Sequence, residues 1–358
     1  MKKTSSYLIL VGFFVLFFTN TYCQSWNFLQ KVVQPKRSAN DVFGQHVVLE
    51  ANYAIIGCWR DDYDQNGRNY IEDAGAAYLY QKSEEGIWSL AKKIVASDRT
   101  LYDGFGYGLK TDGDKVVIGA PFEGAGLVES AGAIYVFENR GGALTEVKKL
   151  FAPDREYLDE FGSKVAISGD WIIVGSPRDS EDENGANAIG GAGSAYLFKR
   201  TGNDWNFAQK IVAFDRDDEN DRFGFSVAIN GDYAVVGASG DRDSGSVYIF
   251  KNGGGGWTEI QKLTVSTDRG FGGGLAMEGN RLVVGSGGLN NSNGNTSTGA
   301  AYIFENTDGV WTEVQRIEPS DGRFLDAFGF TIDLEGDYMV VGSSNNDYDE
   351  NNEIEVLI

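Results

Sequence analysis

The stretch FGFSVAINGDYAVVGAS, from Phe223 to Ser239, contains two apolar runs separated by Asn-Gly-Asp. Both runs are rich in Val, Ala, Ile, Phe and Tyr, and the β-branched and aromatic residues among these favour β-strands. A short connection containing Asn-Gly between such runs is typical of a tight β-hairpin. The stretch therefore predicts two antiparallel strands joined by a turn.

The same pattern occurs six times along the chain. We name its successive runs A, B, C and D; in the fourth unit they read FGFSVAIN, YAVVG, GSVYIF and WTEIQKLT. Each run has the length and composition of a strand, and Gly, Asn or Asp residues bound it. The first and last Phe-Gly pairs are five periods apart, which gives a mean period of 57 residues. Run A begins at Phe43, Phe105, Phe161, Phe223, Phe271 and Phe328.

Four strands per repeating unit are typical of the blade of a β-propeller. The chain begins with a run D at residues 26–33 and ends with a weaker run C at residues 354–358, so that each run occurs six times. We therefore predict an all-β, six-bladed propeller of four-stranded antiparallel blades, closed by pairing of the first and last strands. The alternative is a seven-bladed or truncated propeller. The predicted units are residues 34–95, 96–152, 153–213, 214–264, 265–318, and 319–358 together with 24–33.

Residues 1–23 have the pattern of an export signal. Lys2 and Lys3 precede an apolar segment, residues 8–18, which is too short to span a bilayer comfortably. We expect cleavage after Cys23, which leaves a propeller of residues 24–358 and no disulfide partner for Cys58. Loss of the two lysines changes the formal charge from −21 to −23.

A strongly acidic mature chain excludes nucleic acid and anionic lipid as partners. No later segment is apolar enough for membrane insertion, so we expect a protein that is secreted or held at the cell surface, or retained in the periplasm. Its expected partner is an extracellular protein or a polysaccharide. We expect the protein itself to be monomeric or part of a larger surface assembly.

In FGFSVAINGDYAVVGAS, Phe-Gly is followed by Val-Gly-Ala, and in FGYGLKTDGDKVVIGAP it is followed by Ile-Gly-Ala-Pro. These units resemble the FG-GAP repeat of integrin α-subunit heads and of many exported bacterial proteins. The resemblance covers essentially the whole mature chain. It implies a propeller and suggests adhesion or ligand binding. Integrin-type repeats carry a calcium loop between runs A and B, whereas here that connection is a tight turn, such as residues 230–232. The calcium positions of the family are therefore not transferred to this chain.

An acidic connection lies instead between runs B and C of the first unit and reads DDYDQNGRNYIED, residues 61–73. From its second residue it follows the spacing D-x-D-x-N-G-x5-D, with oxygen ligands at alternate positions, a glycine at the bend and a carboxylate at position twelve. The alternative is that these residues only form a solvated turn. We predict a calcium site made by the side chains of Asp62, Asp64, Asn66 and Asp73 and the carbonyl of Arg68.

Two further B–C connections carry related patterns. In the third unit, SEDENG offers Ser180, Asp182 and Asn184 but no carboxylate at the twelfth position, so we expect only a loop. In the last unit, NDYDENNE has Asn352 at the glycine position, and asparagine can also adopt a left-handed turn. The predicted calcium ligands of this last loop are Asp347, Asp349, Asn351 and Glu353.

Aspartates also recur around the Phe-Gly pairs. Because a feature repeated in nearly every unit is typical of architecture, we expect turn capping and ion pairs between blades from them. An aspartate lies two residues before five of the Phe-Gly pairs, at Asp41, Asp103, Asp159, Asp221 and Asp326. Asp-Arg pairs lie upstream of four of them and begin at Asp98, Asp154, Asp215 and Asp268.

In an antiparallel blade, the B–C and D–A connections share one face of the propeller. Variable loops on a rigid scaffold commonly carry recognition. The sequence has no nucleophile motif, no His-Cys metal cluster and no phosphate loop, and its single histidine, His46, lies on an inner strand where packing is the commoner role. We therefore expect a calcium-dependent binding or adhesion module and not an enzyme. The alternative is a carboxylate-based polysaccharide hydrolase or lyase acting in the propeller channel.

Overall fold

The computed structural model describes residues 30–36, 38, 40–124, 130–140, 143–217, 219–266, 268–287, 298–320, 322 and 326–344. The chain divides into two compact units, Met1–Val32 and Val33–Ile358. All the strands described below belong to the second unit. The predicted export signal at residues 1–23 and the last predicted run C at residues 354–358 lie outside the described residues.

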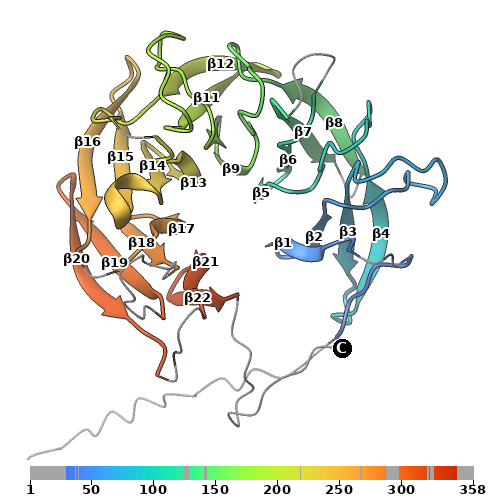
Figure 1. Cartoon of the computed structure of the whole chain (residues 1–358). Coiled ribbons are helices and arrows are strands. Elements are labelled where there is room, and N and C mark those ends of the chain that lie inside the picture. The colour runs from blue at the N-terminus through green and yellow to red at the C-terminus, as the bar shows by residue number, and fades with distance from the viewer. Residues whose placement is uncertain are drawn as a thin grey trace, which may run out of the picture. The chain divides into compact units, whose positions relative to one another are not determined.

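Runs A and B form hairpins, as their short turns require; five of the six turns contain glycine, and the first, residues 50–52, reads Glu-Ala-Asn. In Figure 1 the A strands surround a common centre, and each B strand lies next to them. The A strands are β1 (Phe43–Leu49), β5 (Leu109–Asp112), β9 (Lys164–Ser168), β13 (Phe223–Asn230), β17 (Phe271–Glu278) and β21 (Phe328–Glu335). The B strands are β2 (Tyr53–Cys58), β6 (Lys115–Ala120), β10 (Trp171–Ser176), β14 (Tyr233–Ala238), β18 (Arg281–Ser286) and β22 (Tyr338–Ser343).

Runs C and D complete five four-stranded antiparallel sheets, and β21–β22 form a two-stranded one. The helical part of the described chain is one 3₁₀ turn, η1 (Asp241–Asp243). These sheets confirm an all-β propeller with six blades. The C strands are β3 (Ala76–Lys82), β7 (Ala133–Arg140), β11 (Ser194–Thr201), β15 (Ser246–Asn252) and β19 (Ala300–Thr307). The outer D strands are β4 (Trp88–Ile94), β8 (Ala143–Leu150), β12 (Asp204–Ile211), β16 (Trp257–Thr264) and β20 (Val310–Ile317).

Adjacent blades meet through their backbones at the positions where the sequence repeats glycine. The Phe-Gly segment leaves the A–B ladder in an irregularity of the register, and the φ angles of its glycines lie between 87° and 98°, a region that favours glycine. A Cβ on Gly119 of β6 would lie 2.0 Å from the carbonyl oxygen of Gly162 in the next blade. A Cβ on Gly132, which precedes β7, would lie 2.0 Å from the carbonyl oxygen of Phe161. One contact between blades thus requires the glycines of runs A, B and C.

The phenylalanine of the Phe-Gly pair connects two blades. In the third blade, the Phe161 amide donates a hydrogen bond of 3.1 Å to the carbonyl of Ala131 in the second blade. Its fully buried ring packs edge to face on Tyr196 of its own blade, with 5.4 Å between ring centroids. Such aromatic pairs contribute about 0.5–1.5 kcal/mol beyond the burial of their area. The backbone of this residue is therefore held by one blade and its side chain by the next.

The sixth blade is described only as β21 and β22. Of the predicted run D at residues 26–33, only residues 30–33 are described, and they do not form a strand, which corrects that part of the prediction. In the other blades a D strand pairs with a C strand, and here the predicted partner lies outside the described residues.

Apolar side chains on both sides of this region remain exposed. Val47 of β1 is 55% exposed, whereas its counterpart Val165 in the third blade is 7% exposed. Val340 of β22 is 70% exposed, whereas its counterpart Val117 is fully buried. Exposed apolar faces of this kind need a covering strand, so closure of the ring stays our prediction.

The glycine contact gives the first test. In the Gly119→Ala variant, the new methyl group meets the Gly162 carbonyl, so the blades must shift, and we expect the free energy of unfolding to fall by about 1–3 kcal/mol. Urea denaturation measures this loss. Gly255→Ala is the matched control, because a Cβ there meets no atom within 4 Å, and its effect should stay within about 0.5 kcal/mol. Equal stability of the two variants would contradict a backbone contact between blades.

Ring closure gives a second test. Deletion of residues 24–32 removes the predicted closing strand but keeps Val33, whose carbonyl accepts a 2.9 Å hydrogen bond from Tyr80. We expect a large decrease in melting temperature and aggregation, because an unpaired edge and an apolar blade face would be left in water. Calorimetry and light scattering measure both effects. A truncated protein that melts like the full chain would rule out closure by this segment.

Candidate functional site

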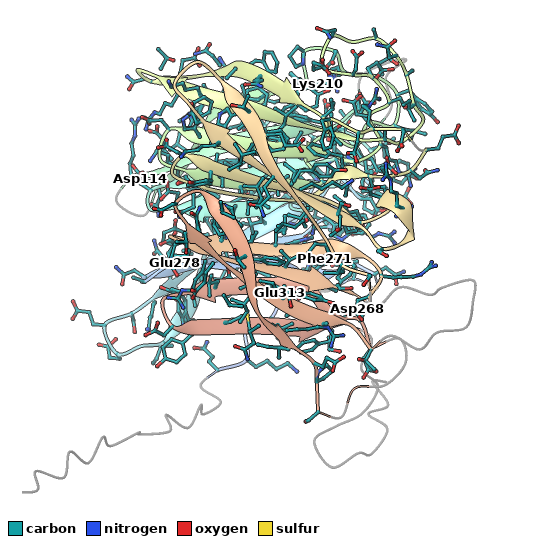
Figure 2. The ribbon with its side chains drawn as sticks, turned by 90° about the vertical axis from the view of Figure 1, so that its left-hand side faces the viewer. Asp114, Lys210, Asp268, Phe271, Glu278 and Glu313 are labelled. Atoms are coloured by element: carbon teal, nitrogen blue, oxygen red, sulfur yellow. The ribbon has the colours of Figure 1, made fainter. Side chains whose placement is uncertain are left out.

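The B–C connections and the D–A linkers meet on one face of the propeller, which we call the loop face. In the first blade, the Arg99 side chain of the linker donates a 3.1 Å hydrogen bond to the carbonyl of Asp62, and the Gly104 amide donates one of 3.1 Å to the carbonyl of Asp73. Figure 2 places Asp114 and Glu278, next to the A–B turns, toward the left and Asp268 of a D–A linker toward the right. The contacts between linker and loop confirm that the acidic loops and the Asp-Arg segments share a face.

Residues 61–75 form a loop that is closed by its own aspartates. The Asp64 carboxylate accepts hydrogen bonds from the amides of Asn66 (2.9 Å) and Arg68 (2.8 Å) and from the Asn69 side chain (2.5 Å). The backbone amide of Asp64 in turn donates to the Arg68 carbonyl at 3.1 Å. These bonds hold the pKa of Asp64 below its usual value, because they stabilise the carboxylate; the largest contribution comes from the Arg68 amide.

The other predicted ligands of this loop also have partners. The Asp62 carboxylate accepts a 2.9 Å hydrogen bond from the Asp73 amide. The Asp73 carboxylate lies 3.9 Å from the Arg60 guanidinium, and burial raises its pKa above the usual value. The second predicted loop, with Asp347, Asp349, Asn351 and Glu353, lies outside the described residues. The calcium sites therefore stay predictions.

The loop of residues 179–193 in the third blade repeats the same network. Asp182 accepts the amides of Asn184 (2.8 Å) and Ala186 (2.9 Å), and its own amide donates to the carbonyl of Ala186 at 2.8 Å. The Arg216 side chain donates to the carbonyls of Asn187 and Ser180, as Arg99 does in the first blade. The two loops thus share one conformation, although the sequence predicted a calcium site for the first and only a loop for the second. The carboxylate that closes each loop is the one at its fourth position.

The described residues bring one group of three carboxylates together. Ligand oxygens of Asp159, Asp179 and Glu181 lie within 4.8 Å of one another on the loop face of the third blade. Burial raises the pKa of Asp159 to about 7, and the neighbouring charges of Asp179 and Glu181 add to this effect. The pKa of Glu181 is raised by burial and by Asp179. Of the three, only Asp179 contacts a cation among the described residues: Lys210, at 2.8 Å. A group with this excess of negative charge can hold a metal ion.

Sequence spacing did not reveal this group. Asp159 precedes Phe-Gly and was assigned to architecture, whereas Asp179 and Glu181 follow run B about 20 residues later. The first blade has the same two aspartates, Asp41 and Asp61, but carries Tyr63 in place of the glutamate. The fourth blade also has an acidic residue at this position, Asp243, after Asp221 and Asp241, so a third acidic residue occurs in two of the units. Alignment of the six units on their Val-Gly glycines shows these third acidic residues, but it does not show that the fold brings Glu181 close to Asp159.

The recurring aspartates have the structural roles expected of them. Asp154, after run D of the second blade, accepts hydrogen bonds from Tyr196 and Lys210 of the third blade, both at 2.8 Å. The Asp159 carboxylate accepts the amide of Glu156 at 2.6 Å and so caps the turn before Phe-Gly. Turn capping and ion pairs between blades are therefore confirmed. The equivalent bridges are Asp98 with Tyr135 and Lys149, Asp215 with Tyr248 and Lys262, and Asp268 with Tyr302 and Arg316.

Cys58 replaces a serine in a repeated contact. Its thiol is buried and lies 3.3 Å from the carbonyl of Asp41, where it acts as a weak donor. In the third blade, the Ser176 hydroxyl donates to the carbonyl of Asp159 at 2.8 Å. This position explains the cysteine as part of the packing between run B and the Phe-Gly segment.

Aromatic rings gather on the inner side of the loop face between the first two blades. Tyr107 packs against Trp59, Phe122 and His46, with ring centroids 5.4, 5.6 and 5.5 Å away. His46 lies on the inner strand β1, as expected. Burial, with a smaller contribution from the nearby charge of Lys164, lowers the pKa of His46 to about 3, so that its ring is neutral at physiological pH.

Comparison with known proteins agrees with the fold. The chain is similar to the crystal structure of a putative 6-phosphogluconolactonase from Bacteroides uniformis, with a TM-score of 0.52 and 13% identity over 86% of this chain and 81% of that one. This likeness concerns the fold alone. No curated protein matches the chain. In the part of the chain that is described, no helix has the length and apolarity needed to cross a membrane.

The repeats themselves match a known family. Its model, named FG-GAP repeat, matches residues 26–80, 88–137, 144–198, 205–250, 257–304 and 311–354. Each match begins near a run D and ends within run C of the following blade, so the sequence repeat and the sheet differ in phase by one strand. Six matches that together cover most of the chain show that the protein belongs to the FG-GAP repeat family.

Proposed function

We propose that this protein is an exported, calcium-dependent binding or adhesion module that recognises an extracellular protein or polysaccharide through its loop face. Membership of the FG-GAP family and the propeller fold support a binding role. The observation that carries the proposal is the arrangement of this face. The loop face carries two long loops, residues 61–75 and 179–193, and the Asp159–Asp179–Glu181 group. Beneath them, repeated contacts between blades form a rigid scaffold, and variable loops on such a scaffold commonly carry recognition.

We propose two calcium sites on the loop face, and we expect calcium to bind first to the carboxylate group of the third blade. Asp159, Asp179 and Glu181 are close together and carry more negative charge than their one lysine contact balances. Calcium takes six to eight oxygen ligands, including carboxylates that bind through one or both oxygens. In the first loop, Asp62 and Asp64 would have to exchange their amide partners for the ion. We propose the last loop, Asp347 to Glu353, as a further site on its sequence pattern.

The carboxylate group can be tested by calcium titration. A ligand that binds only the folded state stabilises it by about 2.7 kcal/mol at 100 times its dissociation constant, so calcium should raise the melting temperature and chelation should lower it. We expect Glu181→Gln to remove most of this response, because it removes one of the three carboxylate ligands. Glu183→Gln, two residues away and exposed, is the matched control and should respond like the wild type.

A second variant separates the two proposed sites. If calcium binds first in the loop of residues 61–75, Asp64→Ala will abolish the response and Glu181→Gln will not. Isothermal titration calorimetry of the same proteins measures the number of ions bound. Absence of any calcium binding at millimolar concentration would contradict calcium dependence altogether.

The acidic chain restricts the ligand. Its charge favours a neutral or cationic ligand, or a carboxylate that a calcium ion bridges to the protein. We expect binding to depend on the loop of residues 62–73. Shortening this loop to the length found in the fourth blade, while keeping Asp61 because it pairs with Lys93 at 2.6 Å, should abolish binding to cells or glycan arrays and preserve the melting temperature.

The control for this variant is a change on the opposite face. Replacing the C–D turn at residues 253–256 by another four-residue turn alters open surface only, because a Cβ at three of its four glycines meets nothing within 4 Å. Binding that survives the loop edit and is lost in the turn edit would place the ligand on the other face. Turnover of a polysaccharide by the purified protein would replace the binding module by the alternative, a carboxylate-based hydrolase or lyase.

A further inference from the structure

Two lysines extend from inner strands toward other blades around the centre of the propeller. Lys110 of β5 lies 3.6 Å from the carboxylate of Asp333 in β21, so that its charge has a counter-ion. Lys164 of β9 reaches past the second blade instead, and its Nζ lies 3.1 Å from Nε2 of His46 in β1. The two lysines thus come from neighbouring inner strands, but the Lys110 side chain is exposed and ion-paired, whereas Lys164 is partly buried and contacts a histidine.

The position that carries Lys164 and His46 breaks the symmetry of the repeat. It is the third residue after the Phe-Gly phenylalanine, and the other four blades have small residues there: Gly108, Ser226, Gly274 and Thr331. Gly108 and Gly274 pack closely on the next blade, where a Cβ would lie 2.5 and 2.6 Å from a backbone carbonyl oxygen. Architecture therefore favours a small residue at this position. A lysine and a neutral histidine at this position are unlike the repeated contacts that hold the blades together.

The Lys164–His46 pair lacks a negative charge. Among the described residues, no carboxylate lies within 4.0 Å of Lys164. A carboxylate does contact each of the other partly buried lysines, Lys93, Lys149, Lys210 and Lys262.

Burial lowers the pKa of Lys164 to about 8, so it still carries its charge at neutral pH. An ammonium group is only a donor, so Nε2 of His46 must accept and the ring proton must lie on Nδ1. Nδ1 is buried without a partner. A cation without a counter-ion and a buried donor without an acceptor are two groups that a bound oxyanion would satisfy.

The surroundings of the pair indicate the rest of the ligand. The ring of Tyr107 packs against His46, and the rings of Trp59 and Phe122 pack in turn against Tyr107. Arg60 stacks on Trp59, with its guanidinium carbon 4.5 Å from the ring centroid. Small-molecule sites commonly combine such aromatic rings with a few convergent polar groups.

We propose that Lys164 and His46 form a binding site for the carboxylate of a ring-bearing organic acid, such as a uronic acid, with the ring lying against Tyr107 and Trp59. The ammonium group donates to the carboxylate and supplies the single positive charge that a monocarboxylate needs. This site goes beyond the proposed function, because its charged group, Lys164, comes from an inner strand and the site requires no calcium.

The test is calorimetric titration of the full chain in EDTA with D-glucuronate as the probe. D-glucose is the neutral match, and sulfate is the oxyanion without a ring. We expect glucuronate to bind and glucose and sulfate to bind at least roughly tenfold more weakly, because each lacks one of the two recognised features. Lys164→Met should weaken glucuronate binding by roughly tenfold to a hundredfold, since it removes a charged hydrogen-bond donor.

Two further variants keep the outcome decisive. Lys110→Met removes a lysine from the neighbouring inner strand and should leave glucuronate binding unchanged. Lys164→Arg keeps the charge and should retain binding, even if Lys164→Met lowers the melting temperature. Equal binding of glucose or sulfate, or glucuronate binding that does not depend on Lys164, would overturn the proposal. Because EDTA is present throughout, loss of the calcium proposal leaves this result unaffected, and failure of this test leaves the calcium proposal unaffected.

Discussion

The close approach of one blade's backbone to the next is the contact on which the rest of the structure depends. The carbonyl of the Phe-Gly glycine lies where any side chain on the preceding Val-Gly glycine would have to be, as Gly162 and Gly119 show. This contact sets the distance between sheets near the centre. It also fixes the phenylalanine, whose amide donates a hydrogen bond to the preceding blade and whose ring packs within its own blade. Farther out, the Asp-Tyr-Lys bridges, such as Asp154 with Tyr196 and Lys210, can form because the spacing is already set.

Most of this architecture could be predicted from the sequence, because each strand recurs with its own residue type. Repetition identified the four strands of a blade, the tight A–B turns and the structural role of the aspartates before Phe-Gly. Ring closure could not be checked in this way, because its strands lie largely outside the described residues. The carboxylate group of the third blade was missed because Asp159 and Glu181 belong to different connections, and only the fold brings them together. The pairing of His46 with Lys164, which joins the first blade to the third, has no signature in local spacing.

The departures from the repeat are therefore more informative about function than the repeat itself. Six similar units satisfy the same packing requirements, so residues that recur, such as the bridging lysines, are explained by those requirements. At the position of Glu181 the first blade has Tyr63 and the fourth has Asp243, and at the position of Lys164 four blades have a small residue. Each of Glu181 and Lys164 places an ionisable side chain at a partly buried position. Buried charge is costly unless it is paired, which is why these two positions carry the two binding proposals.

The phase difference between sequence repeat and sheet has a consequence for how the protein folds. The match at residues 88–137 supplies β4 to one sheet and β5, β6 and β7 to the next, so a single repeat does not encode a complete sheet. A repeat excised at its sequence boundaries would carry an outer strand without its ladder and three strands without an outer edge. Such a fragment cannot satisfy its own backbone hydrogen bonds. Neighbouring blades are therefore expected to gain and lose order together, which gives this repeat protein the cooperativity of a single domain rather than the stepwise behaviour of an array.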